Sequence, residues 1–294
     1  MVLVFMLGLL AASITERRAE IATLYNNKKI EITGINTNSE EWGINYPREY
    51  DTWKKTKEMD FRSKHLGNMP EDVLESRPEM VVLWAGYAFS RDYSAPRGHM
   101  YTIEDVTHTL RTGTPDHEHK DMQPATCWAC KSPDVPRMMH EVGIENFYKA
   151  SWSQFGSEIV NPVGCADCHD PKTMNLTITR PALIEAFERQ GKDITKATPQ
   201  EMRSLVCAQC HVEYFFKGDG KYLTFPWDGG MTVESMEEYY DNANYTDWVH
   251  HLSKAPMLKA QHPDYEIFLL GPHAQRGLSC ADCHMPYMSE GGIK

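Results

Sequence analysis

Residues 165–169 read CADCH, and the same C-x-x-C-H pattern returns as CAQCH at 207–211 and as CADCH at 280–284. This pattern is the attachment signal of c-type haem. The two thiols form thioethers with the vinyl groups of the porphyrin, and the adjacent histidine reaches the iron from the same side. The residues concerned are Cys165, Cys168 and His169, then Cys207, Cys210 and His211, and finally Cys280, Cys283 and His284. The three repeats predict a chain that folds around covalently bound haem.

A fourth cysteine pair differs from the other three. The stretch ATCWACKSP, residues 125–133, contains Cys127 and Cys130 but has Lys131 where the histidine would stand. Lysine ligates iron only as the neutral amine, so its pKa must be lowered by burial and by the metal. If the opposite face of that iron is open, the iron is a catalytic site rather than an electron carrier. The alternatives are a lost ligand or a surface lysine beside an unrelated cysteine pair.

The whole cysteine content of the chain is used by these motifs, since all eight cysteines belong to the four pairs. Zinc ribbons also use C-x-x-C pairs, but they do not need a histidine directly after each second cysteine. Disulfides are the other alternative for an exported chain. The intervals between the pairs are unequal, which indicates haem sites embedded in one fold rather than a solenoid of repeats. Haem therefore explains the pattern better than zinc or disulfides.

Composition and charge narrow the classes of function. The 294 residues are 41% hydrophobic and 24% charged, which provides enough apolar sequence for a packed core. The formal net charge is −11. Because a phosphate-binding surface needs clustered lysine and arginine, this balance argues against nucleic acid as a partner.

The first residues are typical of an export or anchoring segment. The run from Val2 to Ile14 is uncharged and largely apolar, and charge begins at Glu16. It suits the apolar part of a signal peptide, and it is shorter than the roughly 20 residues of a membrane-spanning helix. We expect residues 1–20 to be a signal peptide or membrane anchor and residues 21–294 to form one multihaem domain. A buried N-terminal strand or helix is the alternative.

Local patterns predict a mainly α protein with long loops and little β structure, whose core is built around the covalently bound haems. The clearest helix start is at Thr198, where Pro199 and Glu201 complete a capping-box signature. Helices are expected at 102–113, with Thr102 as N-cap and Gly113 as stop, and at 180–191, 198–216, 235–242 and 262–270. Strand-like alternation is found at 174–180, and 217–230 is typical of a turn-rich loop.

Five blocks of the sequence together resemble one family, the pentahaem, ammonia-forming cytochrome c nitrite reductases. The blocks are TCWACK (126–131), GHMYTIEDVTHTLRTG (98–113), CAQCHVEYFF (207–216), PMLKAQHPDYE (256–266) and GPHAQRGLSCADCHMP (271–286). They follow the family's order from about Trp42 to the last residue. The family has a fifth haem motif downstream of the fourth, and this sequence has none. We therefore expect 21–294 to be an incomplete catalytic domain that lacks its C-terminal part.

The resemblance implies a nitrite site on the open face of the haem ligated by Lys131. Arg111 would supply a fixed cationic donor to the substrate oxygens. His262 would donate hydrogen bonds and protons, and Tyr214 would be a second polar contact. Nitrite would take up six electrons and eight protons and leave as ammonium and water. Without the resemblance, Arg111 could be a helix-end cation, His262 a helix cap and Tyr214 a core residue.

The resemblance also implies a calcium site. Glu213 and Gln261 would contribute side-chain oxygens, and Tyr214 and Lys259 would contribute backbone carbonyls. Ligation by oxygen alone suits this hard cation. From the residues themselves, Glu213 could equally be an ordinary helix carboxylate.

Further haem ligands and partners follow from the same resemblance. His99 resembles the distal ligand of the third haem and His273 the distal ligand of the fifth, while the second and fourth haems would take histidines from beyond Lys294. The family implies five haem c groups, a periplasmic homodimer and a membrane quinol-oxidising cytochrome as electron donor. The alternatives are a multihaem electron-transfer cytochrome without a substrate, or a related hydroxylamine- or sulfite-reducing enzyme.

Overall fold

The computed structural model describes residues 2–26, 28–34, 36–58, 64, 69–113, 115 and 123–288, with the side chains of the first helix described up to residue 18. Helices dominate this part of the chain and its strands are short, so the predicted mainly α class is confirmed. The α-helices are α1 (Val2–Asn26), α2 (Ser39–Asn45), α3 (Pro47–Lys55), α4 (Val73–Ser76), α5 (Glu79–Leu83), α6 (Thr102–Thr107), α7 (Asp134–Val142), α8 (Ile144–Lys149), α9 (Cys165–Cys168), α10 (Pro181–Arg189), α11 (Pro199–Ala208), α12 (Val233–Asn242), α13 (Asp264–Leu270), α14 (Pro272–Gln275) and α15 (Cys280–His284). The 3-10 helices are η1 (Thr56–Glu58), η2 (Ala88–Ser90), η3 (His99–Tyr101), η4 (Ala125–Trp128), η5 (Trp152–Phe155) and η6 (Ile194–Lys196).

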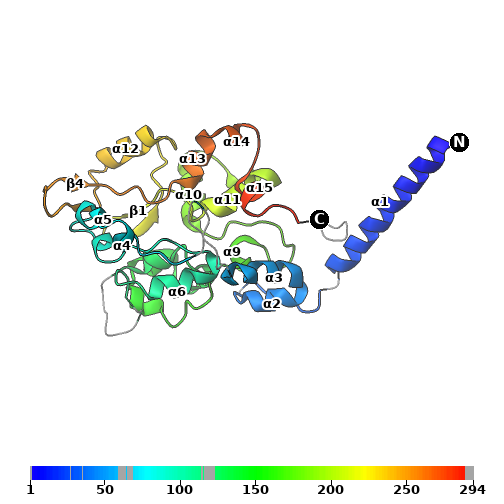
Figure 1. Ribbon diagram of the computed structural model, residues 1–294, viewed down its shortest axis with the longest axis horizontal. Helices are drawn as coiled ribbons and strands as arrows, with labels where there is room; N and C mark the ends of the chain where they lie inside the picture. Colours follow the sequence, from blue (N-terminus) through cyan, green and yellow to red (C-terminus); the bar gives the residue numbers. More distant parts are fainter. Residues whose placement is uncertain are drawn as a thin grey trace.

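The strands form two small antiparallel hairpins. Strand β1 (Phe215–Lys217) pairs with β2 (Tyr222–Thr224), with Phe216 opposite Leu223. Strand β3 (Trp248–Val249) pairs with β4 (Pro256–Met257). Figure 1 shows these short strands at the margin of a body of helices and long loops, with α12 at the end of the body away from α1. That the core is built around haems stays a prediction, and a cluster of buried hydrophobic side chains is present next to the cysteine motifs.

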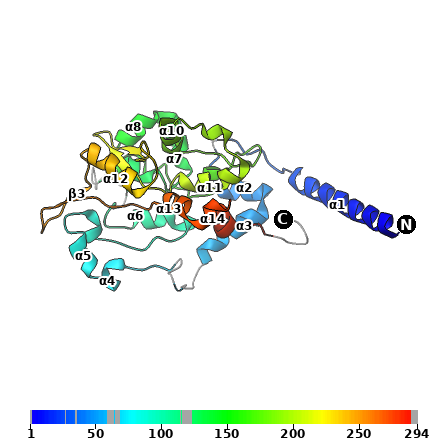
Figure 2. The same ribbon diagram turned by 90° about the horizontal axis from the view of Figure 1, so that it is seen from above.

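Helix α1 extends from the body as a separate arm, with α2 and α3 at its base, and Figures 1 and 2 agree on this from two directions. Its apolar side chains are exposed, from 78% of the surface of Val2 to 45% of that of Ile14. The alternative of a buried N-terminal element is therefore wrong. Within the described ranges, no helix combines the length and the apolarity needed to cross a membrane.

Most of the predicted helices form, and their starts have the expected cause. At α11 the Glu201 N–H donates to Thr198 Oγ1 (3.2 Å) and the Thr198 N–H donates to the Glu201 carboxylate (2.7 Å), which is the reciprocal pair of a capping box. Helix α10 begins at Pro181 and is followed by Gly191 at φ +71°, as the sequence indicates. The helices at 235–242 and 262–270 correspond to α12 and α13, but the helix expected at 198–216 is wrong in its extent, because α11 ends at Ala208 and β1 begins at Phe215.

The predicted helix at 102–113 is wrong in its extent and in its cap. Helix α6 ends at Thr107, and its N-cap is Tyr101 rather than Thr102. The Thr102 hydroxyl instead donates to the Lys131 carbonyl (2.8 Å) and accepts from the Val163 N–H (3.1 Å). The Thr102 hydroxyl therefore makes a tertiary contact with the lysine motif instead of capping α6 as the local sequence pattern predicted.

The predicted strand at 174–180 is also wrong. This segment makes only an isolated bridge, between His169 and Leu176, and the N–H groups of Thr179 and Arg180 donate to the Gln209 side chain instead of to a neighbouring strand. Strand β2 instead lies inside 217–230, the segment expected to be a loop. Positive φ at Gly218 and Lys221 makes the tight turn that lets β1 and β2 pair.

The main hydrophobic core surrounds the lysine motif. Trp128, between the two cysteines of that motif, is fully buried, and its ring stacks on Trp152 with centroids 3.5 Å apart and planes 7° apart. The Trp128 Nε1–H also donates to the Trp152 carbonyl at 3.0 Å. Phe147 stacks on Phe155 in the same cluster. The strand-poor fold thus places the lysine motif within its main hydrophobic core.

One buried arginine ties the first two motifs together. Arg180 precedes α10 and only 3% of its side chain is exposed. Its Nε donates to the carbonyl of Ala129 (2.7 Å) and its Nη2 donates to the carbonyl of Ser132 (2.8 Å), on either side of Lys131. The same Nη2 is paired with the Asp167 carboxylate, inside the second motif. A planar guanidinium can hold three directions at once because its donors have a fixed geometry.

Gln209, in the third motif, completes this connection. Its amide oxygen accepts from the backbone N–H of Arg180 (2.9 Å), and its amide nitrogen donates to the Asp167 carbonyl (3.2 Å). Gln209 is 2% exposed, so these bonds form away from water. Arg180, Asp167 and Gln209, here called the buried knot, therefore fix three cysteine motifs relative to one another.

We expect Arg180→Ala to lower the free energy of unfolding of the haem-loaded protein by about 3–5 kcal/mol, because it leaves the buried Asp167 carboxylate without its cation. Denaturant titration measures the change. The matched control is Arg189→Ala on α10, whose pair with Asp228 is 31% and 43% exposed and should contribute about 1 kcal/mol or less. Equal losses in the two variants would contradict a central role for the buried knot.

Candidate functional site

The four cysteine pairs are held on short helical turns. Cys127 lies in η4 with Cys130 just after it, Cys165 and Cys168 bound α9, Cys207 is near the end of α11, and Cys280 begins α15. All eight cysteines are free thiols. The disulfide alternative is thus absent from the described residues, and the thiols are available for thioether formation.

The residue before the second cysteine has a structural role in both CADCH motifs. Asp167 accepts from the Gly164 N–H (2.8 Å), and Asp282 accepts from the Ser279 N–H (2.7 Å), so each caps its own motif. Each also pairs with an arginine of another segment: Asp167 with the buried knot, and Asp282 with Arg203 at 2.9 Å. The variable positions of the motifs therefore connect the attachment sites to the rest of the fold.

Thiols of different motifs meet in the middle of the molecule. The Cys130 and Cys210 side chains share a hydrogen bond, and this bond lowers the pKa of Cys130 to about 7. Cys207 and Cys280 share another, which lowers the pKa of Cys280 to about 6. The third motif is thus adjacent to the lysine motif on one side and to the fourth motif on the other.

The motif histidines are oriented through one ring nitrogen. His169 Nδ1 is hydrogen-bonded to the carbonyl of Met174 at 2.8 Å, and His211 Nδ1 to the carboxylate of Asp264 at 3.0 Å. Both arrangements leave Nε2 free, which is the usual state of a histidine that ligates a metal. The ring of His99 faces that of His211 with centroids 6.4 Å apart. This gap admits one metal ion about 2 Å from a nitrogen of each ring, so the donor set fits haem iron.

Three of the predicted ligands are exposed. These are His211 and, on α14 and α15, His273 and His284; among the described residues the structure does not bring His273 to a motif histidine. Their ligand roles stay predictions. His65, His117 and His119, for which the sequence predicts no role, lie outside the described residues.

The structure brings together the four residues expected at the substrate site. The rings of Tyr214 and His262 have centroids 5.4 Å apart. The pKa of His262 is lowered to about 4, first by burial and then by the neighbouring charges of His211 and Lys131. Burial also lowers the pKa of Arg111, which in turn lies close enough to Tyr214 and Cys127 to interact with them electrostatically. These residues come from four separate segments of the sequence.

Two polar atoms of this group are buried without a hydrogen-bond partner, namely Arg111 Nε and His262 Nδ1. Nearly all buried polar atoms in proteins are paired, so an unpaired donor needs an explanation such as a ligand. The Arg111 guanidinium lies over the ring of Phe89, with Cζ 4.1 Å from the centroid, which orients the unpaired Nε. The site therefore has an unpaired guanidinium donor and an unpaired imidazole nitrogen, and the cationic guanidinium suits an anion.

The oxygens expected to hold calcium are also close together. The Glu213 carboxylate accepts from the Tyr240 hydroxyl (2.8 Å) and from the Gln261 N–H (2.6 Å). The Lys259 ammonium donates to Gln261 Oε1 at 3.0 Å and to the carbonyl of Ala260 at 3.1 Å. The Lys259 ammonium thus lies in the region expected for calcium. Burial is the main cause that raises the pKa of Glu213 to about 7, and it outweighs the hydrogen bonds from Gln261 and Tyr240 and the charge of Lys259.

Sequence reasoning missed three polar residues of this region. Glu266 accepts from the Glu213 N–H (2.9 Å) and from Trp227 Nε1 (2.7 Å), and its other carboxylate oxygen is buried without a partner. Tyr87 stacks on Trp248, and burial raises its pKa to about 12. Asp264 contacts His211. Glu266 and Asp264 belong to the block KAQHPDYE (259–266), and their place in this block could have marked them as residues of the site.

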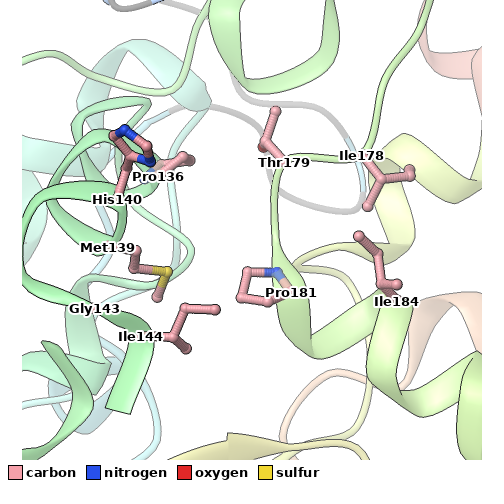
Figure 3. A pocket seen from close by; sticks show the side chains of 9 residues that line it. All are labelled: Pro136, Met139, His140, Gly143, Ile144, Ile178, Thr179, Pro181 and Ile184. Atoms are coloured by element: carbon pink, nitrogen blue, oxygen red, sulfur yellow. The ribbon is translucent and has the colours of Figure 1, made fainter. Parts of the chain in front are cut away.

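The groove drawn in Figure 3 is separate from this site. It has a volume of about 450 Å³, and its lining is mostly aliphatic and proline side chains of α7, α8 and the approach to α10. His140 is the titratable residue among them. None of the residues expected to bind substrate, haem or calcium lines it.

Comparison with known proteins decides the family. The sequence model of the cytochrome c552 family matches residues 38–294. The chain belongs to the cytochrome c552 family. It is 68% identical to the cytochrome c-552 of Parabacteroides distasonis over 294 residues, which is 100% of this chain and 60% of that protein. It is 48% identical to the cytochrome c-552 of Desulfotalea psychrophila, over 98% of this chain and 57% of that protein.

Among solved structures, the chain is similar to the cytochrome c nitrite reductase of Desulfovibrio desulfuricans, whose catalytic subunit is described with two calcium sites. The TM-score is 0.82 and the sequence identity 35%, over 90% of this chain and 61% of that one. The resemblance drawn from the sequence blocks is thus confirmed for the cytochrome c552 family. The chain spans about three fifths of the length of these relatives.

Proposed function

We propose that the protein of which this chain forms part reduces nitrite to ammonium at a haem held by Cys127, Cys130 and Lys131. The observation that carries the proposal is the pair of buried nitrogens without a hydrogen-bond partner, Arg111 Nε and His262 Nδ1, beside the lysine motif. Membership of the cytochrome c552 family and likeness to a cytochrome c nitrite reductase support the same reaction.

Arg111 and His262 have separable roles in this proposal. Arg111 binds the anion, because a buried guanidinium attracts negative charge and its free Nε offers a directed hydrogen bond. His262, whose pKa is lowered to about 4 mainly by burial, is neutral near pH 7, so its protonated nitrogen can donate a hydrogen bond to a substrate oxygen. Burial keeps both groups away from competing water.

Tyr214 provides the third contact. Its pKa is raised by burial and by the nearby thiols, so the hydroxyl remains protonated and acts as a hydrogen-bond donor. Its ring packs beside His262 and Phe216, which fixes the direction of the hydroxyl. The haem, when bound, supplies reducible iron that passes electrons to the substrate nitrogen.

The further motifs and histidines supply the electron path in this proposal. Haem c at the motifs ending in His169, His211 and His284 would carry the six electrons that one nitrite requires. The facing rings of His99 and His211 support ligation of the third haem from both sides. His273 would serve a fifth haem, as the family resemblance implies.

We also propose that calcium binds beside the substrate site. Glu213 and Gln261 would provide side-chain oxygens, and Tyr214 and Lys259 would provide backbone carbonyls. The calcium sites described for the Desulfovibrio desulfuricans enzyme support this assignment, as does the buried carboxylate of Glu213. Because Gln261 adjoins His262, the ion would hold the proton donor in place.

The location and partners are proposed from family resemblance. The protein would work in the periplasm, because c-type haem is attached after export. The family resemblance implies a homodimer. A membrane quinol-oxidising cytochrome would supply the electrons.

We expect Lys131→His to change nitrite reduction strongly while the haem remains attached. The reduced, haem-loaded protein is titrated with nitrite, and ammonium is followed for the wild type and the variant. Ammonium from the wild type, with a rate altered about 10-fold or more in the variant, supports a reaction at this position. If wild-type protein consumes no nitrite and binds no cyanide, it is an electron carrier. If it prefers hydroxylamine or sulfite, the substrate assignment is wrong.

We expect Arg111→Ala to lower kcat/KM for nitrite by roughly 100-fold, because loss of a directed donor to a developing negative charge costs about that much. Arg111→Lys should recover part of the loss by keeping the charge without the planar fork. The control is Arg91→Ala, an exposed arginine of the same part of the chain, which should leave kcat/KM unchanged. A similar decrease in both alanine variants would show a general charge effect instead of substrate binding.

We expect Glu213→Gln to weaken calcium binding at least ~10-fold, because the site loses its charged ligand. Calcium retained after dialysis is measured by elemental analysis, and a chelator should slow nitrite reduction in the wild type more than in the variant. Glu185→Gln, which removes a half-buried carboxylate that binds Tyr222 elsewhere, is the matched control. Undiminished calcium in Glu213→Gln would exclude the proposed ligand set.

A further inference from the structure

Asp264 makes a contact that the proposed reaction does not use. Its Oδ2 lies 3.0 Å from Nδ1 of His211, the histidine of the third motif. The next residue strengthens the connection, since the Tyr265 N–H donates to the His211 carbonyl at 3.1 Å. The start of α13 therefore holds His211 by its side chain and by its backbone.

This contact distinguishes the third motif from the second. His169 has a neutral backbone carbonyl, that of Met174, at its Nδ1. Within the described ranges, Asp264 is the one carboxylate that hydrogen-bonds a motif histidine. A bond to a carboxylate is charge-assisted and is stronger than a bond to a neutral carbonyl.

The chemical consequence falls on the opposite ring nitrogen. A carboxylate at Nδ1 fixes the tautomer with the proton on that atom, so Nε2 is the free ligand, and it raises the basicity of the ligand. A more basic imidazole stabilises the oxidised, more positive iron over the reduced iron. We propose that Asp264 is a positioning residue that lowers the reduction potential of the haem iron bound by His211, relative to an iron whose histidine has a carbonyl partner.

The position of the third motif gives this effect a purpose. Cys210 of that motif contacts Cys130 of the lysine motif, and the ring of His211 lies 6.0 Å from that of His262. An electron that reaches the substrate site from the third motif thus starts from an iron whose potential Asp264 sets, and a lower potential is a stronger reductant. This purpose rests on the proposed function, whereas the contact and its effect on potential do not.

The test is a redox titration of the haem-loaded protein, followed by absorption and by electron paramagnetic resonance. In Asp264→Asn we expect one midpoint to move to more positive potential, with a change in the resonance of that haem alone. Asp264→Glu keeps a carboxylate and should return the midpoint toward that of the wild type. The matched control is Asp170→Asn, which removes a charge next to His169. Asp170 is suitable because it accepts from the N–H groups of residues 172 and 173 and not from the histidine ring.

Two results would overturn the proposal. The first is an Asp264→Asn midpoint shift no larger than that in Asp170→Asn, since the effect would then be general charge. The second is an equal shift in Asp264→Asn and Asp264→Glu. Nitrite assays on the same samples separate this idea from the proposed function. A shifted midpoint in a protein that forms no ammonium supports the effect of Asp264 on the potential and contradicts nitrite reduction. Ammonium formation with unshifted midpoints supports nitrite reduction and contradicts the effect of Asp264.

Discussion

The structure depends on one buried cation placed among peptide carbonyls and a carboxylate. The Arg180 guanidinium contacts the backbone on both sides of Lys131, and it neutralises Asp167 in the next motif. Such a group would be costly to bury alone, and it is tolerated because its partners are complete and well directed. Gln209 extends the same arrangement to the third motif. The relative positions of three attachment sites thus follow from a few polar contacts instead of from a sheet or a helix bundle.

The candidate site differs from the buried knot, because two of its buried polar atoms have no hydrogen-bond partner. A buried polar atom without a partner costs about 1–3 kcal/mol, and Arg111 Nε and His262 Nδ1 are two such atoms. The surrounding packing bears this cost: Phe89 supports the guanidinium, and Tyr214 and His211 flank the imidazole. The fold therefore stores free energy at the place where an anion can release it. On the other side of Gln261, Glu266 has one buried carboxylate oxygen without a partner, and the neighbouring Glu213 carboxylate is buried as well.

The sequence predicted the chemistry better than the geometry. The C-x-x-C-H spacing indicated the attachment sites because covalent chemistry needs those residues at fixed local distances, and the capping box at Thr198 was readable for the same reason. Arg180, Asp264 and the tertiary role of Thr102 could not be predicted, because each acts on a residue far away in the sequence and leaves no local pattern. The strand expected at 174–180 does not form because a distant side chain, that of Gln209, takes the backbone N–H groups of Thr179 and Arg180. Arg111, Tyr214 and His262 were selected through family resemblance, and packing alone brought them together.

The burial of Trp128 and Ala129 sets an order of events in the maturation of this protein. These two residues lie between the thiols of the lysine motif, and they are 0% and 1% exposed. An attachment factor that must handle this motif as an open peptide cannot reach it once the surrounding core has closed. Cys283 and His284 of the fourth motif, by contrast, are still at the surface of the folded chain. The thiols of the lysine motif pack against this core whereas Cys283 remains open to solvent, so we expect haem to reach the lysine motif before the core closes.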